Sequence, residues 1–405
     1  MEFELKIIEE HKHERYLLLH QNGGTYQVSA LLYQVLLQYK GGKSYQDIAV
    51  AMNEKHNATS FDDAFIKRTV TNALYSSEQE VASAGKEQHY VAGRIPVIKE
   101  GRLLWLYKIL SVFFQQQLFP VLFCFSAAVT GLFLYNSGLL SFANLWNRSV
   151  THLSVGDTVT VYFLFMCIVL LHELGHATAS YTFGVKPKEI GFGWYFIFPV
   201  LYANVSDIWQ LPASRRNVVN IAGVYFQLLV NVILISCYYN NISQPLLCTL
   251  IISNTISMVC SLIPFFRYDG YWLFSDYFNI PNLKAKSASL AAGVLLGGVG
   301  KWRQIKGSLP LALHFYTLAS VVFWLFVYAE VARLIVLNSR LLLGNLQQGG
   351  WLYITITPEG LFSAVFTVIS LWVLIIHSIQ LYKLLGYERQ KISGTKKPYS
   401  HWNIA

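Results

Sequence analysis

Charged side chains are scarce in this 405-residue sequence, in which Asp, Glu, Lys and Arg make up 13% of the residues and hydrophobic residues 54%. Length alone would fit two or three soluble domains, but the apolar residues occur in long uncharged runs. A helix of about 20 apolar residues crosses the ~30 Å hydrocarbon core of a bilayer. The runs predict a polytopic α-helical membrane protein with about six spans, near residues 118–140, 158–181, 218–239, 246–265, 309–332 and 360–383.

Cysteine is also rare, and the five cysteines all fall inside predicted spans without forming a CxxC pair. This pattern excludes a disulfide framework and a thiolate zinc site of the CxxC type. We interpret the cysteines as small apolar packing residues.

The start of the sequence, MEFELKIIEEHKHERY, lacks the apolar stretch of a signal peptide. We therefore expect the first ~95 residues to stay in the cytoplasm. The net charge of +9 is concentrated on that side, where the loops and the tail hold fifteen Lys and Arg residues against three on the other side. By the positive-inside rule, this bias predicts an inner or cytoplasmic membrane protein with both termini cytoplasmic. It also explains the positive charge without a nucleic-acid partner.

The first 80 residues predict a small α+β domain of winged-helix-like order. The segment RYLLLHQNGGTYQVS alternates apolar and polar residues and contains the turn signal NGG, which indicates a hairpin. Serines precede two of the following helical patterns as capping residues. The predicted helices cover residues 30–40, 45–55 and 60–76.

Residues 81–117 are interpreted as a linker that ends in an aromatic, basic interfacial helix. Residues 188–212 are rich in aromatic and β-branched residues, which predicts strands packed on protein or at the interface, because strand edges cannot face lipid. We interpret the glycine-rich segment 287–300 as an interfacial or re-entrant piece. The predicted domain boundaries are 1–80, 81–117, 118–335 and 336–405.

The second predicted span contains HELGH, which places His172, Glu173 and His176 in hydrocarbon. Histidines four residues apart share one helix face and can bind a single Zn²⁺, while the glutamate between them can take a proton from water. A charged residue at mid-bilayer costs at least about 2.5–3.5 kcal/mol, so we expect a functional reason for it. The sequence therefore predicts a zinc site with Glu173 as its general base.

A catalytic zinc site needs a third protein ligand and leaves one position open. Asp269 follows the fourth span on the same membrane side and at a matching depth. We expect Gly270 to let the backbone turn this carboxylate toward the metal. Weaker candidates are Asp276, which lies further out, Asp207 in the strand-like loop, and Asp157 on the opposite side. His314 and His377 are lone histidines in predicted spans.

HELGH in a predicted span and the later Pro-x₄-Asp-Gly-Tyr-Trp resemble the site-2 protease family of intramembrane zinc metalloproteases, over about residues 118–335. The resemblance implies three zinc ligands and one water-activating glutamate, which are His172, His176, Asp269 and Glu173. It also implies an asparagine that polarises the scissile carbonyl, for which Asn254 is the candidate. The sequence departs from the family at Val224, where proline is common.

The first 80 residues resemble a PqqD-like domain, the recognition element that binds leader peptides of ribosomally made, modified peptides. The hairpin-and-helices order and the segment YQVSALLYQVLLQYKGGKSYQDIA carry this resemblance. Such domains bind the leader as an added strand. The whole chain resembles bacterial peptide zinc metalloproteases, which implies a precursor peptide as substrate and an export transporter as a further partner.

Three alternatives stay open. The chain could be a regulatory site-2 protease that acts on a membrane-bound transcription or anti-sigma factor. It could instead be a non-catalytic peptide-binding export or immunity partner in which zinc is structural. The N-terminal domain could also be an unrelated winged-helix cap.

Overall fold

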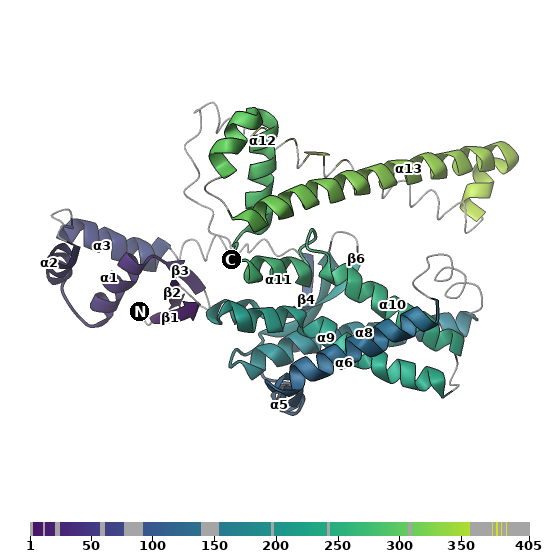
Figure 1. The fold of residues 1–405 in the computed structure, drawn as a ribbon, viewed down its shortest axis with the longest axis horizontal. Coiled ribbons are helices and arrows are strands. Elements are labelled where there is room, and N and C mark those ends of the chain that lie inside the picture. The colour runs from purple at the N-terminus through teal and green to yellow at the C-terminus, as the bar shows by residue number, and fades with distance from the viewer. Residues whose placement is uncertain are drawn as a thin grey trace. The chain divides into compact units, whose positions relative to one another are not determined.

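The chain divides into two units, Met1–Tyr277 and Phe278–Ala405. The computed structural model describes residues 3–10, 13–20, 25–56, 61–76, 92–138, 154–195, 198–240, 244–306 and 310–356, and five single residues between 375 and 386. Figure 1 shows the helices and strands of both units.

The N-terminal residues form a three-stranded antiparallel sheet. β1 (Phe3–Glu10) pairs with β2 (His13–His20), and β2 pairs with β3 (Thr25–Val28). The predicted hairpin is confirmed as β2 and β3, although its NGG turn lies outside the described residues. β1 is an additional strand that the sequence analysis did not predict.

Three helices follow this sheet, as predicted: α1 (Ala30–Lys40), α2 (Tyr45–His56) and α3 (Asp63–Thr71), which continues as a π-helical turn. The side chain of Ser29 accepts a hydrogen bond from the Leu32 amide and caps the first of them. Apolar residues of the sheet and of all three helices pack into one core that includes Leu18, Leu36, Met52 and Ile66.

Five helices among the described residues are long and apolar enough to cross a membrane. They are α6 (Leu118–Asn136), α8 (Val155–Thr182), α9 (Ala213–Tyr239), α10 (Gln244–Leu262) and the part of α13 (Leu311–Ile356) that ends at Leu337. They correspond to five of the six predicted spans and fit a multi-pass helical membrane protein. The sixth predicted span, 360–383, lies almost entirely outside the described residues.

Helix α9 packs against α6, α8 and α10, and these four helices run side by side in Figure 1. One close approach to α8 is at Gly175, where an added Cβ would lie 2.5 Å from the carbonyl oxygen of Ala222. Small residues allow such close packing between membrane helices, whose association has little hydrophobic driving force. This contact brings the HELGH turn of α8 directly against α9.

A second antiparallel sheet has the strand order β4 (Ala92–Lys99), β5 (Glu189–Tyr195) and β6 (Phe198–Asn204). The strands predicted within residues 188–212 are therefore confirmed, and a short 3-10 helix, η3 (Ser206–Gln210), follows them.

The strand β4 corrects the prediction of a linker, because it lies inside residues 81–117. Arg94 of β4 binds Glu189 at 2.6 Å, and its guanidinium lies 4.4 Å from the ring centre of Tyr202. These contacts with residues far along the sequence hold β4 in the sheet. The sequence of β4 contains Pro96, which is tolerated at the edge of a sheet but does not favour a strand prediction.

The rest of residues 81–117 forms two short helices, α5 (Leu104–Leu110) and η2 (Ser111–Phe114). Trp105, Ile109 and Val112 are exposed along them. The helical part of the prediction is confirmed, and the interfacial location stays a prediction.

The second unit begins with α12 (Leu283–Lys306), which is followed by α13. The glycine-rich segment 287–300 lies within continuous helix, and its interfacial or re-entrant role stays a prediction. The domain boundaries given above also stay predictions.

Candidate metal centre

Helix α8 carries the HELGH residues in its C-terminal half. Its start is fixed by Ser154 and Asp157, whose side chains each accept a hydrogen bond from the other's backbone amide. Because the helix is continuous to Thr182, the two histidines lie one turn apart. Their ring centres are 4.8 Å apart, and the distance between their Nε2 atoms is 3.1 Å.

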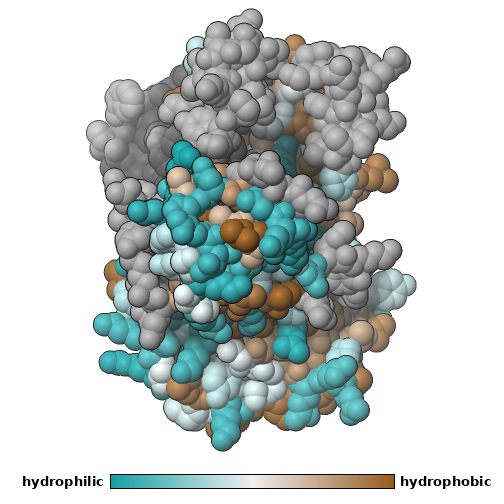
Figure 2. Space-filling view, turned by 90° about the vertical axis from the view of Figure 1, so that its left-hand side faces the viewer, coloured by the Kyte–Doolittle hydropathy of each residue, from teal (hydrophilic) through white to brown (hydrophobic). Residues whose placement is uncertain are grey.

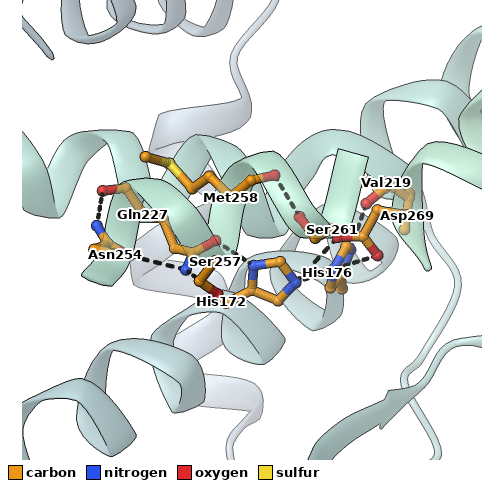
Figure 3. Close-up of polar contacts among 9 residues, drawn as sticks. All are labelled: His172, His176, Val219, Gln227, Asn254, Ser257, Met258, Ser261 and Asp269. Atoms are coloured by element: carbon orange, nitrogen blue, oxygen red, sulfur yellow. Dashed lines mark hydrogen bonds and ion pairs between the residues drawn. The ribbon is translucent and has the colours of Figure 1, made fainter. Parts of the chain in front are cut away.

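Asp269 is the first residue of α11 (Asp269–Tyr277), which packs against α9. Its Oδ2 lies 3.1 Å from His172 Nε2, and its Oδ1 lies 3.3 Å from His176 Nε2. Figure 3 shows the carboxylate beside the two imidazoles. The structure thus brings together the three side chains that the sequence analysis selected as ligands.

We expected Gly270 to let the backbone turn toward the metal, and this physical reason is wrong. Gly270 is the second residue of helix α11 and is absent from the glycines with positive φ among the described residues. An added Cβ would overlap the backbone carbonyl of Leu262, the last residue of α10. Glycine is required because α11 packs tightly against the end of α10, and this packing fixes the position of Asp269.

Both imidazoles are held through Nδ1, which leaves Nε2 facing the carboxylate. His176 Nδ1 lies 2.7 Å from the backbone carbonyl oxygen of Val219, and His172 Nδ1 lies 2.8 Å from Gln227 Oε1. A carbonyl can only accept, so His176 carries a proton on Nδ1 and, when neutral, presents a bare Nε2. Asp269 Oδ2 is buried and has no hydrogen bond of normal geometry.

Three acceptor atoms that face one another at these distances require a cation or added protons between them. Zn–N and Zn–O distances of about 2.0–2.1 Å give a tetrahedron with edges of about 3.3 Å. The two Nε2 atoms are 3.1 Å apart, which is close to such an edge, and with one oxygen of Asp269 the three ligand atoms lie within 4.8 Å of one another. The residues therefore fit a zinc ion and leave one position of the tetrahedron open.

The charge on Asp269 also suits a cation. Burial by itself would raise the pKa of this carboxyl group, but the adjacent imidazoles of His176 and His172, in their protonated form, outweigh burial and hold the pKa well below its usual range. The carboxyl group is therefore ionised at neutral pH.

Glu173 is half-buried on α8 and interacts electrostatically with both histidines and with Asp269. The backbone of Ala203 in β6 lies close enough to this carboxylate to favour its charged form. The strands pack on α8 here, with Ile190 and Ala203 against Leu174. The second sheet consequently lies beside the predicted base.

Asn254 is fully buried on α10 and does not face the three ligand atoms directly. Its Oδ1 accepts from Gln227 Nε2 at 2.9 Å, and its Nδ2 donates to Asn231 Oδ1 at 2.8 Å. The structure places Asn254 behind His172, with Gln227 between them. Its contact with a scissile carbonyl stays a prediction.

The weaker candidates have other partners. Asp276 binds Arg216 at 2.9 Å, and Asp207 binds Lys188 at 2.8 Å. Asp157 caps α8, and His314 Nδ1 lies 3.1 Å from the carbonyl oxygen of Pro310. His377 is outside the described residues. Among the residues that the structure describes, His172, His176 and Asp269 form the one group with metal-ligand geometry.

Sequence reasoning missed two residues that shape this site. An added Cβ on Gly223 of α9 would lie 2.5 Å from His172 Nε2 and 2.6 Å from His176 Nε2, so glycine makes room for both rings. Gln227 binds His172 from the same helix. Both residues could have been noticed in the sequence, because a glycine and a glutamine are unusual inside an apolar helical run. The contact made by Val219 uses only its backbone and leaves no signal.

Comparisons with known proteins give one distant likeness. The chain is 23% identical over 124 residues to a protein of Bacillus subtilis (strain 168) that bears the name "Putative peptide zinc metalloprotease protein YydH". The match covers 30% of this chain and 48% of that protein, so the chain spans about half the length of its relative. No family model matches the chain, and no solved structure matches it.

Proposed function

We propose that this protein is an intramembrane zinc endopeptidase. The observation that carries the proposal is the convergence of His172, His176 and Asp269 on one point, with Glu173 beside them, at a helix that can cross a membrane. Structural zinc sites are usually closed by four protein ligands, whereas three ligands and an open position are typical of catalysis. The name of the distant relative supports the same activity.

In this proposal the two imidazoles and the Asp269 carboxylate hold the ion through Nε2 and carboxylate oxygen atoms. Zinc bound there would supply a Lewis acid that polarises water and the scissile carbonyl. Glu173 takes a proton from the attacking water and returns it to the leaving amine. The backbone of Ala203 beside Glu173 favours the charged form, which is the form that accepts a proton.

The proposed substrate is a ribosomally made, modified precursor peptide that is processed before export, with an export transporter as a further partner. A peptide bond inside a helix is protected by its hydrogen bonds, so the substrate must be extended before it is cut. The sheet beside Glu173 is consistent with an extended substrate. The strand and helix order of the N-terminal residues supports the use of a leader peptide, as does the word "peptide" in the relative's name.

The test is Glu173→Gln, which keeps the side-chain shape and removes the base. We expect product formation from a precursor peptide encoded beside this protein to fall by at least about 100-fold, with zinc content unchanged. Mass spectrometry of the products and metal analysis measure the two quantities. The matched control is Glu330→Gln on α13, where Glu330 pairs with Arg333. Undiminished product from the Glu173 variant refutes the proposed mechanism.

A further inference from the structure

A continuous chain of buried hydrogen bonds runs from His172 away from the ligand atoms and into the interior between α9 and α10. Gln227, Asn231 and Asn254 are each at most 1% exposed. Figure 3 shows the two imidazoles between Asp269 on one side and the carboxamides of Gln227 and Asn254 on the other. Buried carboxamides are costly between membrane helices unless every polar atom finds a partner.

The hydrogen bond farthest from His172, at Thr255, determines which atom donates in every other bond of the series. Thr255 Oγ1 donates its single hydrogen to the carbonyl oxygen of Ile251 at 2.7 Å, because that carbonyl can only accept. The same hydroxyl must then accept from Asn231 Nδ2, which lies 3.3 Å away. Asn231 is thereby oriented with its Oδ1 toward Asn254, from which it accepts at 2.8 Å.

A second, independent contact fixes the orientation of the Asn254 carboxamide. Its Nδ2 also donates to the backbone carbonyl oxygen of Gln227 at 3.0 Å, so its carboxamide cannot be reversed without losing two hydrogen bonds. Its Oδ1 therefore accepts from Gln227 Nε2, and Gln227 must present Oε1 to His172. An oxygen at that position requires the His172 proton on Nδ1, so that the neutral ring presents a bare Nε2.

We infer that Gln227, oriented by Asn254 and Asn231, is a positioning residue that sets the tautomer and the ring plane of His172 for metal binding. The inference rests on the metal site of the proposed function and deepens it. A backbone carbonyl performs the same task for His176, so His172 is the ligand that depends on side chains. Asn254 acts here through Gln227, a role distinct from contact with a substrate carbonyl.

The experiment compares Gln227→Met with Gln227→Glu in the full-length protein in detergent. Methionine has a similar size but a poor acceptor atom. Protonated glutamate keeps an oxygen opposite His172 Nδ1, and its O–H can donate to Asn254 Oδ1 in place of Gln227 Nε2. Ser126→Ala on α6 is the matched control, because the Ser126 hydroxyl is buried and donates to its own helix at Leu122. The readouts are zinc affinity by competition with a chelator and the visible spectrum of the Co²⁺-loaded protein, which reports ligand geometry.

We expect Gln227→Met to weaken zinc binding by about 10- to 100-fold and to alter the Co²⁺ spectrum, as loss of a partner behind a metal-bound histidine usually does. Gln227→Glu should stay within about threefold of the unmodified protein, and Ser126→Ala should not change. The inference is overturned if Gln227→Met binds as tightly as the unmodified protein, or if Gln227→Glu loses as much affinity as Gln227→Met. Absence of zinc binding in the unmodified protein would instead refute the metal site of the proposed function.

Discussion

At the scale of single residues, the candidate site depends on two glycines, which have no side chain, as much as on its ligands. Gly223 leaves room for both imidazoles, and Gly270 lets α11 approach the end of α10. Each glycine lies in helix, where glycine costs about 0.5–1 kcal/mol relative to alanine. Close approach is the physical reason that can offset this cost.

The first prediction therefore concerns Gly223→Ala. The new Cβ would lie 2.5–2.6 Å from ring atoms of both histidines, so at least one ring must move and zinc affinity should fall by about 10-fold or more. Gly131→Ala on α6 is the control, because nothing lies within 4 Å of its added Cβ. Chelator competition measures both variants, and equal zinc affinity in Gly223→Ala and the unmodified protein would contradict this description of the site.

At the scale of elements, α11 is held at both ends. Asp269 begins the helix, and Asp276 near its other end accepts from Arg216 Nε at 2.9 Å and from Asn220 Nδ2 at 2.8 Å, both on α9. The side chains of Arg216 and Asp276 are 2% and 5% exposed. The ion pair thus ties the ligand-bearing helix to the helix that carries Gly223.

We predict that Arg216→Met or Asp276→Leu alone lowers the free energy of unfolding by about 3–5 kcal/mol, because each removes the oppositely charged partner of a buried side chain. The double variant should lose less than the two single losses added together, since it leaves neither charge. Denaturation in detergent measures all four proteins. Strictly additive losses would show that the two side chains do not stabilise each other.

The sequence predicted elements wherever a local pattern sufficed. Apolar runs located five spans, and the spacing of HELGH placed two imidazoles on one helix face. The sequence analysis missed β4, because its pairing with β5 joins residues almost a hundred positions apart. Gln227 was missed for a related reason, because its partner His172 is set by how α9 packs on α8. Such packing leaves no periodic signal in either segment.

At the scale of the whole molecule, the proposed function needs both a membrane-embedded site and recognition of a peptide. The metal-ligand group on α8, a helix long and apolar enough to cross a membrane, is the candidate for the first requirement. The N-terminal sheet and helices are the candidate for the second. The two requirements can be separated by experiment, because the described residues of the candidate metal centre all lie in α8 or after it.

Deletion of residues 1–80 should leave zinc content unchanged and reduce cleavage of a precursor peptide that carries its leader by about 10-fold or more, since leader binding contributes affinity. Cleavage of the same peptide without its leader should change little. If the deletion leaves cleavage of the leader-bearing peptide at its full rate, these residues do not recognise leaders, and a regulatory protease becomes the better description.

The most direct measurement is the zinc content and zinc affinity of the purified full-length protein and of Asp269→Ala. The account predicts about one zinc per chain in the unmodified protein and a clear loss in the variant, because two histidines alone bind zinc poorly. Asp207→Ala, which removes a carboxylate paired with Lys188, should keep its zinc. A protein that purifies without zinc and cannot be loaded with it, or an Asp269→Ala variant that binds zinc as tightly as the unmodified protein, would contradict the account.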